Sequence, residues 1–265
     1  MMAGIYKEAI FEGKVAFIAG GSSGINLRIA QRLAELGARV SIISRSEDKV
    51  QAAVDSIVSV GGTAFGQSAD VRDPEAVAKA LHATAEQYDE IDILVSGAAG
   101  NFVATALDMS PNAFKTVVDI DLLGTFNVLR IGFEHLRKPG ASIINISAGQ
   151  AFVPMIGQSH VGSAKAGVDM LTKNLAMEWG PSGVRVNSIV PGPIEDTEGM
   201  ARLASNEKIK QAFKQTVPLR RYGSKDEIAD LAVFLSSDAA AYITGAIVVC
   251  DGGQTLCGSG GVNVG

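Results

Sequence analysis

A glycine-rich turn between a predicted strand and a predicted helix constrains this chain more than any other feature of its sequence. The segment Ala19–Asn26 (AGGSSGIN) follows a buried apolar strand over Lys14–Ala19 and opens a helix over Ile25–Leu36, which Gly37 ends. Backbone N–H groups and the positive end of a helix dipole can hold a pyrophosphate there. A tight connection without a ligand is the alternative, but the flanking strand and helix favour a dinucleotide site. The predicted contacts are Gly20, Ser22, Ser23, Gly24 and Ile25.

Short β-branched runs alternate with amphipathic segments of helix length along the whole chain. This alternation predicts one α/β domain over residues 1–265, with a doubly wound parallel sheet of the Rossmann type. The other predicted strands are Arg39–Ser44, Thr63–Ala69, Ile91–Ser96, Ala141–Ser147, Val184–Val190 and Ala246–Cys250. The other predicted helices are Pro74–Tyr88, Asn112–Leu136, Ser159–Trp179 and Lys225–Leu235. The long, weakly periodic segment 192–221 predicts a small lid over the substrate.

The composition excludes several classes of protein. Hydrophobic residues make up 47% of the 265 residues and charged residues 19%, so the chain can bury a large core. A net charge of −5 without any run of Lys or Arg gives no footprint for nucleic acid, and no apolar run approaches the roughly 20 residues of a membrane span. Cys250 and Cys257, with no histidine cluster beside them, predict free thiols and no metal site. Residues 1–11 resemble neither a signal peptide nor a transit peptide, so we expect a soluble cytoplasmic protein.

The end of the second predicted strand indicates which dinucleotide the turn holds. A fold that prefers NAD places Asp or Glu there to bind the ribose 2′-hydroxyl, whereas this chain has Ser44, Arg45 and Ser46. An arginine suits a 2′-phosphate, which predicts NADP (NADPH) with Ser44 and Arg45 as contacts. The alternative is that Arg45 is a solvated loop arginine.

With these features the chain resembles the short-chain dehydrogenase/reductase family essentially from end to end. The family writes its glycine motif TGxxxGxG, and here Ala19 stands for the threonine and Asn26 for the last glycine. The resemblance implies further cofactor contacts. Asp70 and Val71, after the third strand, would meet the adenine. The nicotinamide end and the phosphates would be met by Pro191, Gly192, Ile194 and Thr197.

Most of the family's catalytic residues are missing. Its YxxxK pair ends on Lys165, but Val161 stands four residues earlier. Counting without gaps puts Ala148 at the catalytic serine and Asp121 at the tetrad asparagine. Ketone reduction needs a proton on the carbonyl oxygen, which the family takes from the tyrosine. Because valine has no proton to give, the chain is either an inactive dinucleotide-binding scaffold or an enzyme whose proton comes from elsewhere.

A second set of motifs favours the enzyme. One of these motifs, Ala98–Phe102 (AAGNF), replaces the family's common NNAG turn after the fourth strand. The others are Ser110–Lys115 (SPNAFK), Asp119–Asp121 (DID), His160–Lys165 (HVGSAK), Trp179–Pro181 (WGP), Pro191–Ile194 (PGPI) and Thr197–Gly199 (TEG). Together these motifs resemble the 2,4-dienoyl-CoA reductases of the family, above all the peroxisomal type, which also lacks the tyrosine.

This resemblance implies reduction of a 2,4-dienoyl-CoA, an acyl-CoA thioester of fatty acid metabolism, to 3-enoyl-CoA by a homotetramer. Hydride would reach the δ carbon and a proton the α carbon of the extended enolate. The site then needs an oxyanion donor and an acid directed at carbon. Asn101 would donate to the thioester oxygen, while Lys165 and Asp121 would hold the water that delivers the proton.

Each of these roles has a plainer alternative. Asn101 can be an ordinary turn residue, and Lys165 a surface lysine. Asp121 can be a residue of a helix kink or a water-binding residue. His160 is a second candidate acid because the ordinary pKa of histidine lies near neutrality. Gln150 stands where the mitochondrial type has a tyrosine, and it can donate a hydrogen bond but no proton. The alternative enzymatic function is reduction of another activated alkene or of a carbonyl substrate.

Overall fold

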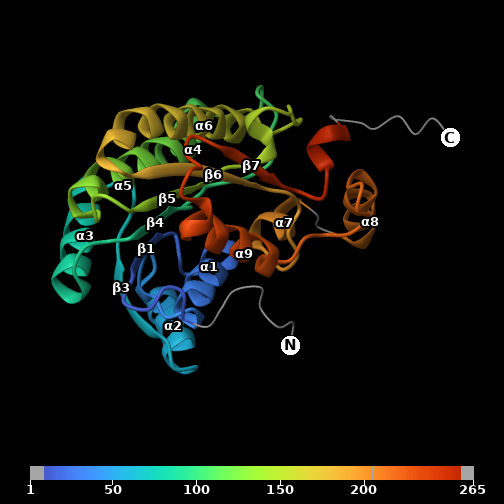
Figure 1. Ribbon diagram of the computed structural model, residues 1–265. Coiled ribbons are helices and arrows are strands. Elements are labelled where there is room, and N and C mark those ends of the chain that lie inside the picture. The colour runs from blue at the N-terminus through green and yellow to red at the C-terminus, as the bar shows by residue number, and fades with distance from the viewer. Residues whose placement is uncertain (1–8, 204–205, 258–265) are drawn as a thin grey trace.

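The computed structural model describes residues 9–203 and 206–257, and a parallel sheet runs through the middle of the molecule (Figure 1). The seven strands of this sheet have the order β3-β2-β1-β4-β5-β6-β7. They are β1 (Val15–Ala19), β2 (Arg39–Ser44), β3 (Thr63–Ser68), β4 (Ile93–Ser96), β5 (Ser142–Ile146), β6 (Arg185–Pro191) and β7 (Ile247–Cys250). The central strands β1, β4 and β5 are buried at every position, because helices cover both faces of the sheet.

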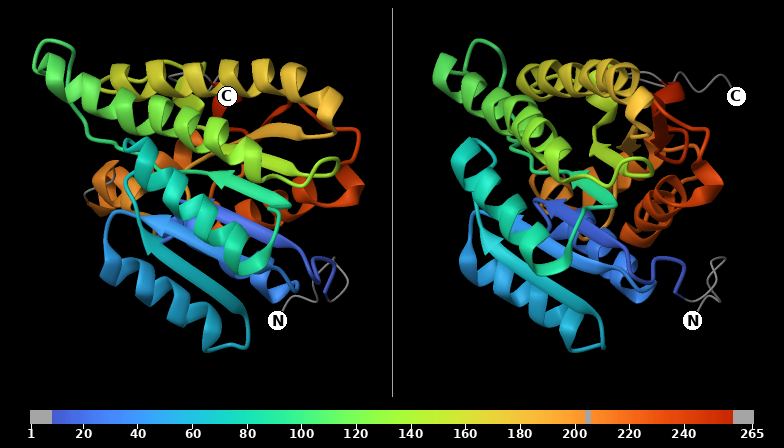
Figure 2. Two further views of the ribbon diagram at one scale, coloured as in Figure 1. Left: turned by 90° about the vertical axis from the view of Figure 1, so that its left-hand side faces the viewer. Right: turned by 60° about the vertical axis from the view of Figure 1, so that its left-hand side comes forward.

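The helices enclose a separate hydrophobic core on each face of the sheet (Figure 2). One core is covered by α1 (Gly24–Glu35), α2 (Glu47–Val58) and α9 (Lys225–Ser236). The other is covered by α3 (Pro74–Tyr88), α5 (Gly124–Gly132) and α6 (Ser159–Trp179). The neighbouring strands β1 and β4 therefore lead into helices on opposite faces. Such a change of face leaves a crevice at the carboxyl ends of the strands, where ligands bind in this kind of sheet.

The predicted fold class is confirmed, and each predicted strand is present with ends within two residues of those observed. Helix α2 is missing from the predicted elements, although its signals are in the sequence. Ser46 caps its N-terminus, with the Ser46 hydroxyl accepting from the Lys49 N–H at 3.4 Å. Val50, Ala53 and Ile57 follow at helical spacing and are buried.

The predicted helix over Asn112–Leu136 is helical along almost its whole length, but it is not one uniform α-helix. The chain forms α4 (Pro111–Val118), then a π-helical turn over Asp119–Leu123, and only then α5, which ends at Gly132. A π-helical turn holds an extra residue and is often found at functional sites. Apolar spacing cannot reveal an added residue inside an otherwise helical pattern, so the sequence predicted helix throughout. The turn matters here because Asp121 lies in it.

The segment 192–221, predicted as a lid, contains α7 (Glu198–Leu203) and α8 (Glu207–Thr216), with residues 204 and 205 outside the described part. The two helices follow β6, and α8 stands at the right edge of Figure 1. None of the helices described by the structure is long and apolar enough to cross a membrane.

Candidate active site

A cleft of about 500 Å³ opens at the carboxyl ends of the strands, where the connections change face. The glycine-rich turn, the ends of β2 and β6, the loops after β3, β4 and β5, and helix α7 all line it. Every residue with a predicted cofactor or catalytic role lines this one cleft: Gly20, Ser22, Ser23, Gly24, Ile25, Ser44, Arg45, Asp70, Val71, Asn101, Asp121, Lys165, Pro191, Gly192, Ile194 and Thr197. The fold thus brings together residues that lie up to 177 positions apart in the sequence.

The glycine-rich turn is shaped by close packing of backbone on backbone. Gly20 has a φ of +79°, and a Cβ on it would lie 2.7 Å from the amide nitrogen of Ala98. Only glycine fits both conditions. Helix α1 begins just after the turn, its N-cap Ser23 makes no side-chain capping bond, and its first turn holds no acidic residue. These unpaired N–H groups fit a bound pyrophosphate.

The end of β2 presents a cation at the rim of the cleft. Arg45 is exposed, and its guanidinium makes no hydrogen bond or ion pair within the described residues. The Ser68 hydroxyl donates to the Arg45 carbonyl at 2.9 Å, which holds the backbone and leaves the guanidinium available. Asp70 differs, because the Arg72 guanidinium donates to both of its carboxylate oxygens, to Oδ1 at 3.0 Å and to Oδ2 at 2.5 Å. This pairing lowers the pKa of Asp70.

A buried ion pair lies at the opposite end of the cleft. Lys165 Nζ stands 3.4 Å from Asp121 Oδ2 and donates to the Ile146 carbonyl at 2.8 Å. The Lys165 and Asp121 side chains are only 5% and 1% exposed. Asp121 Oδ1 accepts a hydrogen bond from the Gly100 N–H at 2.6 Å. Lys165 is therefore no surface lysine, and Asp121 lies in the π-helical turn with its carboxylate directed at the lysine and the loop after β4.

The place of the family's catalytic tyrosine is apolar. Val161 is 4% exposed and lines the cleft, as do Ala148 and Gln150. The Gln150 amide nitrogen contacts the Met155 sulfur at 3.8 Å. No tyrosine lines the cleft among the residues that the structure describes. The cleft therefore lacks the phenol that would protonate a carbonyl oxygen.

The loop after β4 carries Asn101 and is held from two sides. Arg202 of α7 donates to the Asn101 carbonyl at 3.0 Å, and the Gln158 amide donates to the Phe102 carbonyl at 2.7 Å. Asn101 Oδ1 is buried and accepts no hydrogen bond from the described residues. The backbone of Asn101 is thus fixed while its side-chain amide remains free to meet a ligand.

His160 lies behind this loop and not in the cleft wall. Its ring is fully buried and packs on Phe102 with the ring centroids 4.3 Å apart. Burial lowers the pKa of His160, and this effect outweighs the opposite influence of the Phe102 carbonyl and of Asp121. A neutral imidazole outside the cleft is a poor candidate for the acid that the sequence suggested.

Two polar groups of the site escaped the sequence analysis. Ser147, at the end of β5, lines the cleft, and Asp169 lies one turn of α6 beyond Lys165, with its carboxylate accepting from the Ser188 hydroxyl at 3.1 Å. Burial raises the pKa of Asp169 against the effect of the Ser147 and Ser188 hydroxyls. The spacing from Lys165 to Asp169, four residues on one helix, is the signal that could have identified the carboxylate.

Helix α7 is joined to both ends of the cleft by charged side chains. Glu198 pairs with Lys49 of α2 at 3.3 Å, and Arg202 pairs with Glu198 at 3.3 Å. Since Arg202 also holds the Asn101 carbonyl, these contacts run from the neighbourhood of Arg45 to the loop after β4. The sequence offered no sign of the contacts to Lys49 and Asn101, because these residues lie 149 and 101 positions from their partners in α7.

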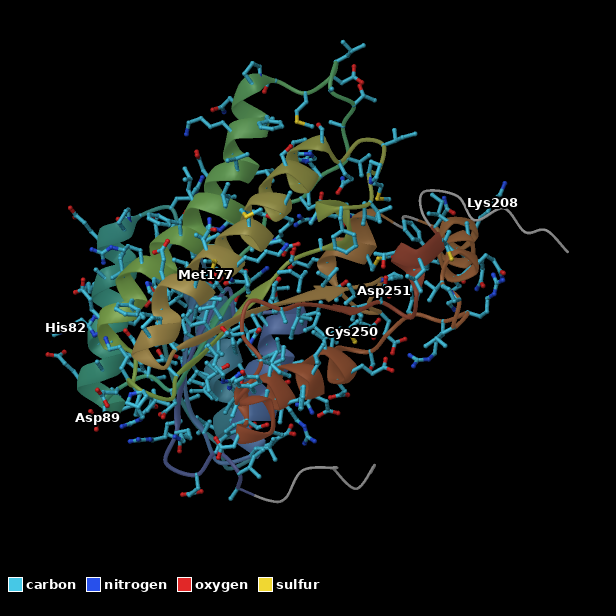
Figure 3. All side chains as sticks on the ribbon, turned by 45° about the horizontal axis from the view of Figure 1, so that its top comes forward. His82, Asp89, Met177, Lys208, Cys250 and Asp251 are labelled. Carbon is cyan, nitrogen blue, oxygen red and sulfur yellow. The ribbon has the colours of Figure 1, made fainter. Side chains whose placement is uncertain are left out.

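The predicted thiols are confirmed as free, since neither Cys250 nor Cys257 forms a disulfide. Figure 3 labels Cys250 beside Asp251 at the end of β7. Within the described ranges, no group of His, Cys, Asp and Glu side chains is arranged to hold a metal ion.

Comparison with known proteins gives one consistent group of relatives. The family model described as enoyl-(acyl carrier protein) reductase matches residues 19–255. The chain is 43% identical to the peroxisomal 2,4-dienoyl-CoA reductase of Danio rerio, over 95% of this chain and 85% of that protein. It is 45% identical to the Rattus norvegicus protein of the same name, over 93% and 85%. A solved short chain dehydrogenase from Bacillus anthracis str. 'Ames Ancestor' is 40% identical, with a TM-score of 0.85 over 93% of this chain and 98% of that one.

These relatives correct one prediction. A cytoplasmic location was expected because residues 1–11 resemble no targeting peptide, but the Danio rerio and Rattus norvegicus relatives are named as peroxisomal proteins. The expectation is therefore wrong. It rested on the absence of one kind of signal, and such an absence does not identify a compartment.

Proposed function

The chain belongs to the short-chain dehydrogenase/reductase family and is an oxidoreductase, and on that premise we propose that it reduces 2,4-dienoyl-CoA thioesters to 3-enoyl-CoA with NADPH. The observation that carries the proposal is the buried Lys165–Asp121 pair in a cleft whose described lining contains no tyrosine. A site without a donor for a carbonyl oxygen suits a substrate whose proton goes to carbon. The relatives named as 2,4-dienoyl-CoA reductases support the same substrate class.

The residues at the cleft fit NADPH. The unpaired N–H groups at the start of α1 face the position of a pyrophosphate, and Arg45 offers an unpaired guanidinium to a 2′-phosphate. Lys165, by its likeness to the family's lysine, would hold the nicotinamide ribose. When bound, the cofactor supplies the hydride for the δ carbon of the substrate.

Asn101 is proposed to stabilise the negative charge that develops on the thioester oxygen. Its backbone is fixed by Arg202, so its side-chain amide can donate from a defined position. A donor that is already oriented needs little reorganisation when the enolate forms. The Asn101 Oδ1 atom, buried without a partner among the described residues, is free to accept from the ligand side.

Lys165 and Asp121 are proposed to hold the water that protonates the α carbon. Asp121 Oδ1 is occupied by the Gly100 N–H, whereas Oδ2 has no hydrogen-bond partner in the described structure and faces Lys165. A water that donates to this Oδ2 and accepts from Lys165 would be fixed beside the cleft. The proton then moves from that water to carbon, and a proton from the ammonium group or from solvent restores the water.

Steady-state turnover decides between this function and its alternatives. We expect the purified protein to consume NADPH with 2,4-hexadienoyl-CoA and not with simple ketones such as cyclohexanone. Consumption with 2-enoyl-CoA alone would instead indicate a reductase of another activated alkene, and ketone turnover would indicate a carbonyl reductase. Tight NADPH binding with no turnover of any of these substrates would indicate an inactive scaffold.

Segment 192–221 is proposed to act as the substrate lid. Its helix α7 lines the cleft and holds the Asn101 loop through Arg202. Closure of this segment over the substrate would exclude water other than the one held by the ion pair. Replacing Arg202 with alanine should raise the KM for the acyl-CoA more than that for NADPH, which steady-state kinetics can measure.

The chain is also proposed to be a homotetramer. The neighbouring helices α5 and α6 expose large apolar side chains, with Phe126 at 45%, Met170 at 56% and Met177 at 81% (Figure 3 labels Met177). Apolar groups gathered on one face often mark an association surface. Light scattering should give the mass of four chains, and Met177→Glu should reduce it. The relatives support a peroxisomal location for this assembly.

A further inference from the structure

Asn26 departs from the family's glycine motif, and the structure shows what its side chain does. It occupies the third position of α1 and is 8% exposed. Its amide nitrogen donates to the Gly97 carbonyl at 2.8 Å and to the Gly20 carbonyl at 3.3 Å. One side chain therefore joins the glycine-rich turn to the loop after β4, two segments that both line the cleft.

Gly97 leaves the space that the Asn26 side chain occupies. A Cβ on Gly97 would lie 2.6 Å from Asn26 Cγ, a distance too short for two carbon atoms without a bond. The amide of Asn26 thus occupies the space that a side chain at position 97 would need. The same two segments also touch directly, since a Cβ on Gly20 would lie 2.7 Å from the Ala98 nitrogen.

The loop after β4, which Asn26 holds at Gly97, continues to the proposed catalytic residues. Three residues separate Gly97 from Asn101, and the N–H of the last of them, Gly100, donates to Asp121 Oδ1 at 2.6 Å. Asp121 in turn pairs with Lys165 at 3.4 Å. A continuous series of polar contacts therefore runs from the Gly20 carbonyl through Asn26 and this loop to the buried ion pair.

Stability alone does not account for Asn26. Its Oδ1 atom is buried without a hydrogen-bond partner among the described residues, which costs free energy that an apolar or absent side chain would not cost. The Nδ2 bonds go to carbonyls of two loops, not to the helix that carries Asn26. These bonds restrain the two loops relative to each other.

We propose that Asn26 is a positioning residue that couples occupation of the dinucleotide site to the placement of the Asn101 loop and of Asp121. A ligand that orders the glycine-rich turn also fixes the position of the Gly20 carbonyl. Because the Asn26 amide donates to both carbonyls, fixing Gly20 also restrains the position of Gly97. The loop after β4 then places Asn101 in its proposed donor position before the acyl-CoA substrate binds. This inference rests on the proposed function for the identity of that substrate.

Two variants separate the hydrogen bonds from the packing. Asn26→Gly removes the amide and leaves a gap beside Gly97. The double variant Asn26→Gly/Gly97→Ala fills part of that gap with a methyl group but restores no donor. We expect the double variant to regain part of the melting temperature that Asn26→Gly loses. In neither variant should binding of the dinucleotide restrain the loop after β4 as it does in the native protein.

The first readout is amide hydrogen exchange with and without saturating NADP⁺, which needs no acyl-CoA. In the native protein, NADP⁺ should slow exchange in a peptide covering residues 97–101 by about tenfold or more. In both variants the slowing should fall below about threefold, even though NADP⁺ is saturating. Equal protection in Asn26→Gly and the native protein would overturn the proposal. Full recovery of the NADP⁺-dependent protection in the double variant would overturn the proposal as well, because packing without the Asn26 hydrogen bonds would then be sufficient to couple the two loops.

The second readout is the dissociation constant of 2,4-hexadienoyl-CoA with and without NADP⁺, measured by titration calorimetry. We expect NADP⁺ to tighten binding several-fold in the native protein, within the 5- to 150-fold range of ordinary coupling, and by less than about twofold in both variants. If the native protein binds no dienoyl-CoA, the proposed function fails and hydrogen exchange still decides the role of Asn26. The native protein could instead bind and turn over the dienoyl-CoA while Asn26→Gly shows the same ratio of dissociation constants without and with NADP⁺. In that case the proposed function stands and only the coupling through Asn26 is refuted.

Discussion

The two ends of the cleft hold their charges in opposite ways. At one end, called the adenosine end because the adenosine of NADPH is proposed to bind there, Arg45 is exposed and unpaired within the described residues. At the other end Lys165 and Asp121 are almost fully buried and face each other. An exposed charge can be removed with little loss of folding stability. Its removal instead weakens the binding of a ligand of opposite charge. A buried pair cannot lose one member without leaving the other uncompensated. We therefore expect the adenosine end to control affinity and the buried end to control turnover.

The buried end should give the largest effect. Asp121→Ala removes the carboxylate that is proposed to hold the water, so kcat for 2,4-hexadienoyl-CoA should fall by about 10²- to 10⁴-fold, the usual loss of general acid–base help. The dissociation constant of NADPH should change little, because Asp121 touches the lysine and not the proposed phosphate contacts. Rapid-mixing kinetics and calorimetry measure the two quantities.

Lys165→Ala is the matched variant at the same pair. It should slow turnover and also weaken NADPH, since the lysine is proposed to bind the nicotinamide ribose. It should further destabilise the fold by about 3–5 kcal/mol, because Asp121 is left as a buried charge without its cation. An unchanged kcat in Asp121→Ala would remove Asp121 from the mechanism and end the contrast between the two ends.

Asn101 should give the next largest effect. Asn101→Ala removes the proposed oxyanion donor and should cost about 2.7–4 kcal/mol of transition-state stabilisation, a 10²- to 10³-fold loss in kcat. Arg202 bonds to the backbone carbonyl of residue 101, so the loop should keep its place in this variant. Gln158→Ala, which releases the neighbouring Phe102 carbonyl, is the control for loop position. A loss in Gln158→Ala as large as in Asn101→Ala would assign the effect to the loop and not to the amide.

The sequence predicted the local geometry around Gly20 and Arg45 better than that around Asp121 and Lys165. The turn at Gly20 and the arginine after β2 are local features, determined by backbone geometry and by adjacency to a strand. Asp121 was located by counting from Gly124, but the π-helical turn that directs it was not predictable, because apolar spacing continues through it. The alternation of strands and helices along the chain is also a local feature, so the fold class was within reach of the sequence.

Contacts between distant segments account for what the sequence missed. Arg202 reaches the Asn101 carbonyl across 101 positions, and Asn26 reaches Gly97 across 71. Such contacts depend on tertiary packing, which no local pattern records. Asn26 was visible only as a departure from the glycine motif, and its purpose became clear when the space at Gly97 was known.

The adenosine end should give a smaller, purely binding effect. Arg45→Ala should weaken NADPH by about 1.5–3 kcal/mol, the value of a hydrogen bond to a charged group, and leave NADH affinity nearly unchanged. Arg72→Ala is the control, since that arginine is already paired with Asp70 and should matter less. Calorimetric titration of both dinucleotides measures the preference. If the native protein binds NADH and NADPH equally well, Arg45 is not the selecting residue.

The smallest effect should come from His160, which is buried like Lys165 and Asp121 but does not line the cleft. Burial lowers its folded-state pKa below the unfolded value near 6.5, so the unfolded chain binds a proton more readily. Stability should therefore be lost as pH falls below about 6.5 toward the folded pKa of His160. His135, whose pKa is lowered mainly by burial, adds to the same trend. In melting experiments between pH 7 and pH 5, His160→Gln should flatten this decline in stability. A steeper decline in His160→Gln would mean that the buried ring is protonated when folded, and would return it to the list of candidate acids.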